Sequence, residues 1–214
     1  MSKNNTIAVI DYNMSNMFSI ENALKNLDLK PKITSDYETI LSCDGAVLPG
    51  VGSFPEAMKN LKKLNLDNAI IDFIESGKPF LGICLGFQLL FDKSDEILDT
   101  NGLGIISGEV KSFSNLDNGM RVPHVGWNLV TKKNSLKIEA FNDPLNNIGN
   151  DEYFYFVHSN FVQPIDNSYA YTLTQYEGFD FCSSIMKDNI FACQFHPEKS
   201  GKQGMQILNN IFNK

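Results

Sequence analysis

The feature that most constrains this chain is an apolar run that ends in a cysteine between two glycines. Residues 80–86 read Phe-Leu-Gly-Ile-Cys-Leu-Gly, and leucines at helical spacing follow Cys84. A Gly-x-Cys-x-Gly pattern between a strand and a helix is the thiol version of the nucleophile elbow, whose glycines allow a turn that a Cβ would block. The pattern therefore predicts a reactive sulfur above the edge of a sheet. The alternative is a buried strand with a structural cysteine, because free cysteines are commonly buried.

Short apolar runs alternate with helical patterns through the first half of the chain. Strands are expected at 7–11, 32–34, 45–48 and 80–83, and helices at 17–27, 55–64 and 67–75. Strands that alternate with helices indicate a parallel sheet with helices on both faces. Ligands of such sheets bind beyond the carboxyl ends of the strands. Both Cys84 and the Pro-Gly-Val-Gly loop at 49–52 are expected at such ends.

The second half of the chain is dominated by strand-like runs, and no linker or repeat separates it from the first half. Strands are expected at 108–113, 127–130, 153–158, 170–175, 181–186 and 190–195, followed by a helix that includes 205–212. The sequence therefore predicts a single domain over residues 1–214. Its fold class is α/β, with three layers: a mixed, mostly parallel, flavodoxin-like sheet with helices on both faces and an antiparallel extension.

Composition narrows the range of functions. The net charge of −7 argues against nucleic-acid binding, which needs a basic face. No apolar run approaches the ~18 residues of a membrane helix, and no signal-peptide pattern is visible, so a cytoplasmic protein is expected. Four cysteines, none at Cys-x-x-Cys spacing, predict reduced thiols and no metal site.

A thiol nucleophile needs a base, and His196 is the best candidate among the three histidines. It follows an apolar strand in the sequence Phe-His-Pro-Glu. Glu198, two residues further on, is placed to accept the imidazole N–H and fix its tautomer. We assign Cys84 as nucleophile, His196 as base and then acid, and Glu198 as the orienting group. A structural histidine at a strand end is the alternative.

Attack by a thiolate also produces an oxyanion, which needs preorganised N–H donors. The amide of Leu85 directly follows the nucleophile. The loop at 49–52 offers further amides, with Gly52 the preferred donor, because glycines let the backbone approach a substrate closely. An ordinary turn that ends a strand is the alternative for this loop.

These motifs, taken in order, resemble those of class I (triad) glutamine amidotransferases. They are Pro-Gly-Val-Gly at 49–52, Gly-Ile-Cys-Leu-Gly-x-Gln at 82–88 and Phe-His-Pro-Glu-Lys-Ser at 195–200. Segments at 9–12, 48–54, 122–128 and 155–159 also resemble one branch of that family, the glutaminase subunits of imidazole glycerol phosphate synthases from histidine biosynthesis. The resemblance spans nearly the whole chain.

The resemblance implies hydrolysis of L-glutamine to glutamate and ammonia through a γ-glutamyl thioester on Cys84, with no cofactor. The substrate contacts that it implies are Gly50, Gln88, Glu96, His158, Ser159 and Asn160. Without the resemblance, Glu96 is interpreted as a solvated surface charge and His158 as a strand-end histidine with no acid–base role.

The chain shows no second active site, such as a phosphate-gripping glycine-rich motif. The resemblance implies that the acceptor site belongs to a (β/α)8-barrel cyclase subunit in a heterodimer. Ammonia would pass through that barrel and yield imidazole glycerol phosphate and an aminoimidazole carboxamide ribonucleotide. The residues expected at the interface are Asn13, Asn16, Pro123, His124, Trp127, Asn128 and Lys199. Core packing is the alternative for Trp127, the only tryptophan.

The chain departs from the family pattern after its first strand. The family usually reads Asp-Tyr-Gly-x-Gly-Asn, where this chain has Asn13 and Ser15 in place of the two glycines. This loop faces the partner in the family, so a related glutaminase subunit that supplies a sugar amidotransferase of surface-polysaccharide biosynthesis is an alternative. Two further alternatives are a thiol hydrolase of γ-glutamyl compounds and a non-catalytic binding module.

Overall fold

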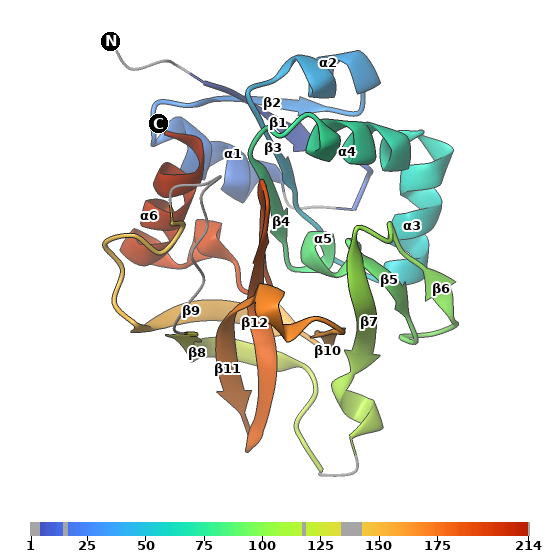
Figure 1. Cartoon of the computed structure of the whole chain (residues 1–214), viewed down its shortest axis with the longest axis vertical. Coiled ribbons are helices and arrows are strands. Elements are labelled where there is room, and N and C mark those ends of the chain that lie inside the picture. The colour runs from blue at the N-terminus through green and yellow to red at the C-terminus, as the bar shows by residue number, and fades with distance from the viewer. Residues whose placement is uncertain (1–4, 15–16, 117–118, 134–142, 214) are drawn as a thin grey trace.

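The first half of the chain and one strand from near its end form the parallel part of one mixed sheet (Figure 1). The computed structural model describes residues 5–14, 17–116, 119–133 and 143–213, and the expected interface residue Asn16 lies outside them. Among the described residues, this part is a continuous run of five strands, each parallel to its neighbours in the run. Their order is β2 (Lys30–Thr34), β1 (Thr6–Ile10), β3 (Gly45–Leu48), β4 (Phe80–Ile83) and β13 (Ile190–Cys193).

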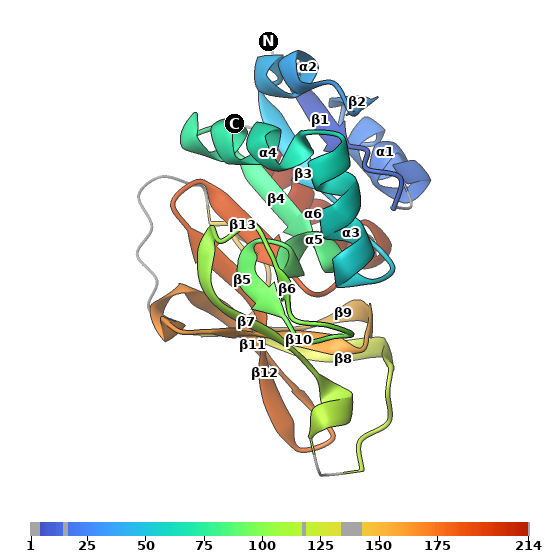
Figure 2. The same ribbon diagram turned by 90° about the vertical axis from the view of Figure 1, so that its right-hand side faces the viewer.

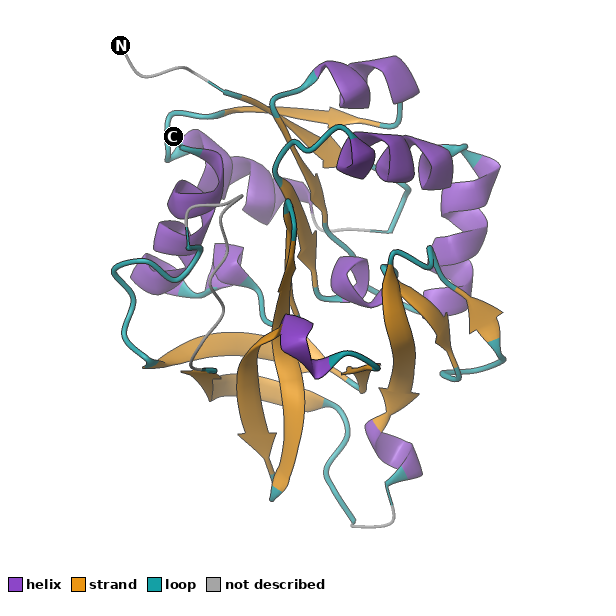
Figure 3. Ribbon diagram, viewed as in Figure 1, coloured by secondary structure: helices purple, strands orange, loops and turns teal. Residues whose placement is uncertain are grey.

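Helices cover both faces of this parallel part. Helices α1 (Met17–Lys25) and α6 (Gly201–Phe212) share one apolar core with one face of the sheet. The opposite face packs against α2 (Tyr37–Ser42), α3 (Phe54–Lys63) and α4 (Leu66–Glu75), as Figure 3 shows. The buried positions of α1, α3 and α4 recur every three or four residues, which is the spacing of a single helix face.

The sheet continues beyond β13 through strands that pair antiparallel, except for the parallel pair β5 and β7. Strand β13 pairs in parallel with β4 on one side and antiparallel with β12 on the other, so it joins the two parts. Figure 2 shows these strands gathered at the end of the molecule away from α2. They are β12 (Phe179–Lys187), β11 (Ala170–Tyr176), β8 (His124–Lys132), β9 (Asp151–His158), β10 (Asn160–Pro164), β7 (Ile106–Ser112), β5 (Phe91–Ser94) and β6 (Thr100–Asn101).

This topology confirms the predicted fold class, a three-layer α/β arrangement with an antiparallel extension. The sequence analysis missed four short elements, namely α2, β5, β6 and β10. It also expected a longer helix after Cys84, where α5 (Leu85–Gln88) is a single turn. These segments are too short to show a periodicity of their own, so tertiary pairing defines them. In the part of the chain that the structure describes, three short 3-10 helices complete the fold: η1 (Phe113–Asn115), η2 (Asn167–Tyr169) and η3 (Pro197–Lys199).

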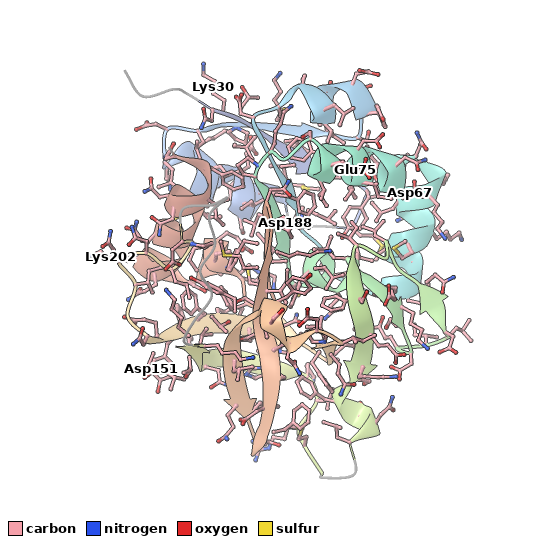
Figure 4. All side chains as sticks on the ribbon, in the orientation of Figure 1. Lys30, Asp67, Glu75, Asp151, Asp188 and Lys202 are labelled. Atoms are coloured by element: carbon pink, nitrogen blue, oxygen red, sulfur yellow. The ribbon has the colours of Figure 1, made fainter. Side chains whose placement is uncertain are left out.

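Charged side chains lie on the outside of the molecule. Figure 4 labels several of them, and Glu75 at the end of α4, Asp188 and Lys202 are exposed to solvent. Among the described residues, no helix combines the length and apolar character that crossing a membrane requires.

We predict that Phe191→Ala lowers the free energy of unfolding by about 3–5 kcal/mol, because the change leaves a cavity in a rigid core. Phe191 is fully buried on β13, where the parallel and antiparallel parts of the sheet meet. Urea unfolding followed by circular dichroism measures the loss. Phe18→Ala is the matched control, since Phe18 on α1 is 72% exposed and its loss should change stability little. An equal effect of the two substitutions would contradict this view of the core.

Candidate active site

The backbone at Cys84 makes a sharp turn between β4 and α5. Cys84 has φ 55° and ψ −111°, a conformation that residues with a Cβ rarely adopt. Its N–H donates to the Cys193 carbonyl at the end of β13, and its carbonyl accepts from the amides of Phe87 and Gln88. The turn is therefore fixed by hydrogen bonds on both sides, as a nucleophile elbow requires.

The glycine after the cysteine is required by close packing. A Cβ placed on Gly86 would lie 1.8 Å from the Leu48 carbonyl oxygen, well inside van der Waals contact. Helix α5 can therefore approach the end of β3 only if residue 86 is glycine. This approach brings the elbow next to the loop at 49–52.

His196 and Glu198 stand at the end of the neighbouring strand β13. The backbone N–H of His196 donates to the Tyr155 carbonyl at 2.9 Å, and Glu198 lies on η3. The His196 Nδ1 to Glu198 Oε1 distance is 2.8 Å. A carboxylate can only accept, so Nδ1 carries the proton. The Nε2 atom is buried and has no hydrogen-bond partner among the described residues, so it is free for proton transfer.

Electrostatics favour the protonated form of His196. Burial lowers the pKa of the imidazole, but the negative charges of Cys84 and Glu198 outweigh burial and raise the pKa well above its usual value. The protonated imidazole is therefore the favoured form of His196 beside Cys84 and Glu198. A protonated His196 can donate a proton from Nε2 to a group bound next to Cys84.

A cavity of about 300 Å³ opens above Cys84. It is lined by Val51, Gly52, Cys84, Leu85, Gln88, Glu96, Pro123, Val157, His158, Ser159 and Asn160. These include both expected oxyanion donors and every expected substrate contact except Gly50, which lies next to the lining residue Val51. The segments 49–52, 84–88, 96 and 157–160 are far apart in the sequence, and the sheet brings them together around one sulfur.

The loop at 49–52 is held by the segment that follows β1. The Tyr12 hydroxyl donates to the Pro49 carbonyl at 2.8 Å, and the Val51 N–H donates to the Met14 carbonyl at 2.9 Å. A Cβ on Gly50 would lie 2.1 Å from the Tyr12 hydroxyl oxygen, so the close contact requires glycine. The Val51 amide is thus occupied and is not available to an oxyanion in this conformation.

Two buried histidines support the far wall of the cavity. His124 Nδ1 lies 2.8 Å from His158 Nε2, and His158 Nδ1 lies 2.7 Å from the Asn160 carbonyl oxygen. Because that carbonyl only accepts, His158 donates from Nδ1 and accepts at Nε2 from His124. Burial lowers the pKa of His124 to about 4 and that of His158 to about 3, so both are neutral near pH 7.

The remaining expected residues lie in different surroundings. Glu96 accepts a hydrogen bond from the Phe54 N–H at 2.6 Å, which fixes it at the start of α3 beside the cavity. Among the expected interface residues, Asn13, Pro123, Trp127 and Lys199 are exposed and Asn128 is half-buried. The side chain of His124 is only 3% exposed, which corrects the expectation that it is presented to a partner. It turns inward because it stacks on Phe156 and bonds to His158.

Gln194 is a residue of the site that the sequence analysis missed. It is fully buried, and its Nε2 lies 3.6 Å from Cys84 Sγ. The available signal was a polar amide inside the apolar run Phe-Ala-Cys-Gln-Phe at 191–195. The roles of Tyr12, Met14 and Val51 in the loop at 49–52 were also missed, because they depend on backbone contacts.

Comparison with known proteins is consistent with this geometry. The family model described as glutamine amidotransferase class-I matches residues 8–214, so the chain belongs to that family. Solved structures with the same fold include one described as a glutamine amidotransferase (TM-score 0.70, 13% identity, 95% of each chain) and PurLQS from Thermotoga maritima (TM-score 0.69, 19% identity, 99% of this chain and 98% of that chain).

Curated relatives specify the branch of the family. The chain is 47% identical to imidazole glycerol phosphate synthase subunit HisH of Caldanaerobacter subterraneus subsp. tengcongensis over 96% of both chains. It is 48% identical to the HisH subunit of Aquifex aeolicus over 96% of this chain and 95% of the relative. Within the class I amidotransferases, the chain therefore belongs with the HisH glutaminase subunits of imidazole glycerol phosphate synthase. The word subunit in these names indicates that a second chain completes the enzyme.

We predict that Glu198→Gln lowers the pKa of His196, because the carboxylate raises this pKa while burial lowers it. An NMR titration with ¹³C-labelled histidine measures the shift. The other two histidines titrate near pH 3 to 4, so they do not obscure it. Glu75→Gln, at an exposed position on α4, is the matched control. An unchanged His196 titration in Glu198→Gln would contradict the assigned role of the carboxylate.

Proposed function

We propose that this chain hydrolyses L-glutamine on Cys84 and delivers the ammonia to a (β/α)8-barrel cyclase partner. The observation that carries the proposal is the placement of Cys84, His196 and Glu198 at adjacent strand ends, below a cavity of about 300 Å³. The family and the names of the HisH relatives supply the reaction class. We further propose that residues 1–214 form one domain and that it acts in the cytoplasm, in keeping with the single sheet and the free thiols among the described residues.

The reaction proceeds in two halves. The Cys84 thiolate attacks the side-chain amide carbon of glutamine, and the imidazolium of His196 gives its Nε2 proton to the departing nitrogen. Ammonia leaves, and a γ-glutamyl thioester remains on the sulfur. His196, now neutral, takes a proton from water, and the resulting attack releases glutamate and restores the thiolate. Glu198 keeps the Nδ1 proton in place throughout.

The tetrahedral intermediates carry a negative oxygen that needs two amide donors. One is the Leu85 N–H, the first amide of α5, which has no acceptor within its own helix. The second must come from the loop at 49–52. Gly52 is the expected donor there, and the bond from the Val51 N–H to the Met14 carbonyl holds the neighbouring peptide of the loop in place. We propose that this bond keeps the loop from presenting its donor fully, and that the loop rearranges when the partner binds.

The partner is proposed to dock on the face formed by β8 and β9. Val125, Trp127 and Tyr153 on these strands are 55%, 56% and 59% exposed, an unusual group of large apolar side chains for a free surface. Pro123, directly before β8, also lines the cavity. Ammonia formed at Cys84 would therefore leave close to the docked barrel. The sugar amidotransferase alternative finds no support in the relatives' names.

Replacement of the nucleophile tests the reaction. Cys84→Ala should lower the glutaminase kcat by roughly 10³-fold or more, because no other group can form the thioester. Glutamate release, measured with the partner present, gives the rate. Cys43→Ala is the matched control, since Cys43 is also buried but lies outside the cavity. Retained activity in Cys84→Ala would exclude the proposed mechanism.

Dependence on the partner is a second test. Glutaminase activity should rise by about 10²–10³-fold when the cyclase and its acceptor nucleotide are added, since one oxyanion donor has about that effect on kcat. The assay compares the isolated chain, the complex, and the complex with acceptor. Full activity of the isolated chain would contradict the proposed role of the Val51–Met14 hydrogen bond.

The docking face can be tested separately. Trp127→Ala should weaken binding of the cyclase by about 2 kcal/mol or more, because a central aromatic side chain is a common hot spot. Isothermal titration calorimetry measures the affinity. Ile165→Ala is the control, as Ile165 is 76% exposed just beyond the end of β10 that lies away from the cavity. Equal binding by the two variants would place the interface elsewhere.

A further inference from the structure

Gln194 contacts the sulfur that the proposed reaction uses. It lies directly after β13, and its backbone N–H donates to the Ser183 carbonyl. Its side chain is fully buried. Its Nε2 is 3.6 Å from Cys84 Sγ, and its Oε1 is 3.0 Å from Gln88 Nε2. Gln194 does not line the cavity, so it reaches the sulfur from the protein interior.

The orientation of the Gln194 amide follows from its neighbours. The Asn160 carbonyl oxygen can only accept, so the Gln88 atom 3.2 Å away must be its amide nitrogen. The same nitrogen faces Gln194 at 3.0 Å, where the acceptor must be Oε1. The NH₂ group of Gln194 is therefore directed at the sulfur. His158 also donates a hydrogen bond to the Asn160 carbonyl oxygen and so helps to fix the position of this acceptor.

The surroundings of Cys84 explain why a donor is needed there. The Val157 carbonyl oxygen lies 3.7 Å from Sγ, where it accepts from a thiol but repels a thiolate. Only 6% of Cys84 is exposed, so little water can solvate a negative sulfur. A buried N–H directed at the sulfur counters the carbonyl, because hydrogen bonds to charged groups are stronger than neutral ones.

We propose that Gln194 is a catalytic residue whose side-chain N–H stabilises the Cys84 thiolate, and that Gln88 is the positioning residue that orients it. This inference rests on the proposed role of Cys84 as the nucleophile. It assigns Gln88 a second task beside lining the substrate cavity. Because Gln194 touches the sulfur and not the cavity, its loss lowers kcat and leaves KM for glutamine nearly unchanged.

The test is the pH dependence of Cys84 alkylation by iodoacetamide, followed by mass spectrometry on the peptide that contains Cys84. Gln194→Met keeps the approximate length of the side chain without an N–H, and Gln194→Glu keeps its shape without that donor. In both, the pH midpoint of alkylation should rise by about one unit or more. The glutaminase kcat should fall roughly tenfold, with KM within about twofold. Gln163→Met, at an exposed position on β10, is the control and should match wild type.

A second measurement needs no substitution at Gln194. In ¹⁵N-labelled wild-type protein, the side-chain amide signals of Gln194 should shift with pH at the midpoint found by alkylation, and Cys84→Ala should abolish the shift. Midpoints unchanged in folded Gln194 variants, or amide signals that do not respond to pH, would overturn the proposal. If Cys84→Ala keeps glutaminase activity, the nucleophile itself is wrong, whereas an inactive Cys84→Ala with unchanged midpoints rejects only the role of Gln194.

Discussion

The left-handed backbone of Cys84 is the constraint on which the whole site depends. A φ of 55° is unfavourable for a residue with a Cβ, at a cost of about 1–3 kcal/mol. The fold offsets this cost with the hydrogen bond from the Cys84 N–H to Cys193 and with the close approach of Gly86 to the Leu48 carbonyl. These contacts fix the position of the sulfur, and the other functional groups are arranged around it from neighbouring strands.

The two parts of the sheet contribute different groups to this arrangement. The parallel part supplies the elbow on β4, the loop at 49–52 after β3, and, through β13, His196 and Glu198. The antiparallel part supplies the wall at 157–160 and the exposed face of β8 and β9. Since β8 and β9 are directly paired, His124 and His158 connect the proposed docking face to the cavity through buried hydrogen bonds.

Sequence patterns were sufficient to predict those parts of the fold and the site that the residue types alone determine. The apolar runs, the elbow glycines and the Phe-His-Pro-Glu segment predicted the parallel strands and the position of Cys84 at a strand end. Contacts between backbone groups could not be predicted from the sequence. The hydrogen bond from the Val51 N–H to the Met14 carbonyl is an example, because residues of almost any type can form a backbone hydrogen bond. The inward orientation of His124 and the contact of Gln194 with the sulfur depend on strand pairing, which has no local signature. Short elements such as α2 and β10 were missed for the same reason.

We propose above all that the strained turn presents Cys84 as the one reactive thiol of this chain toward glutamine. A diazo ketone analogue of glutamine tests it most directly, because it alkylates a nucleophile only after binding as the substrate does. Intact and tandem mass spectrometry of the treated complex should find a single adduct per chain, located on Cys84 and prevented by excess glutamine. An adduct on Cys43, Cys182 or Cys193, or labelling of Cys84 that glutamine does not reduce, would contradict the claim.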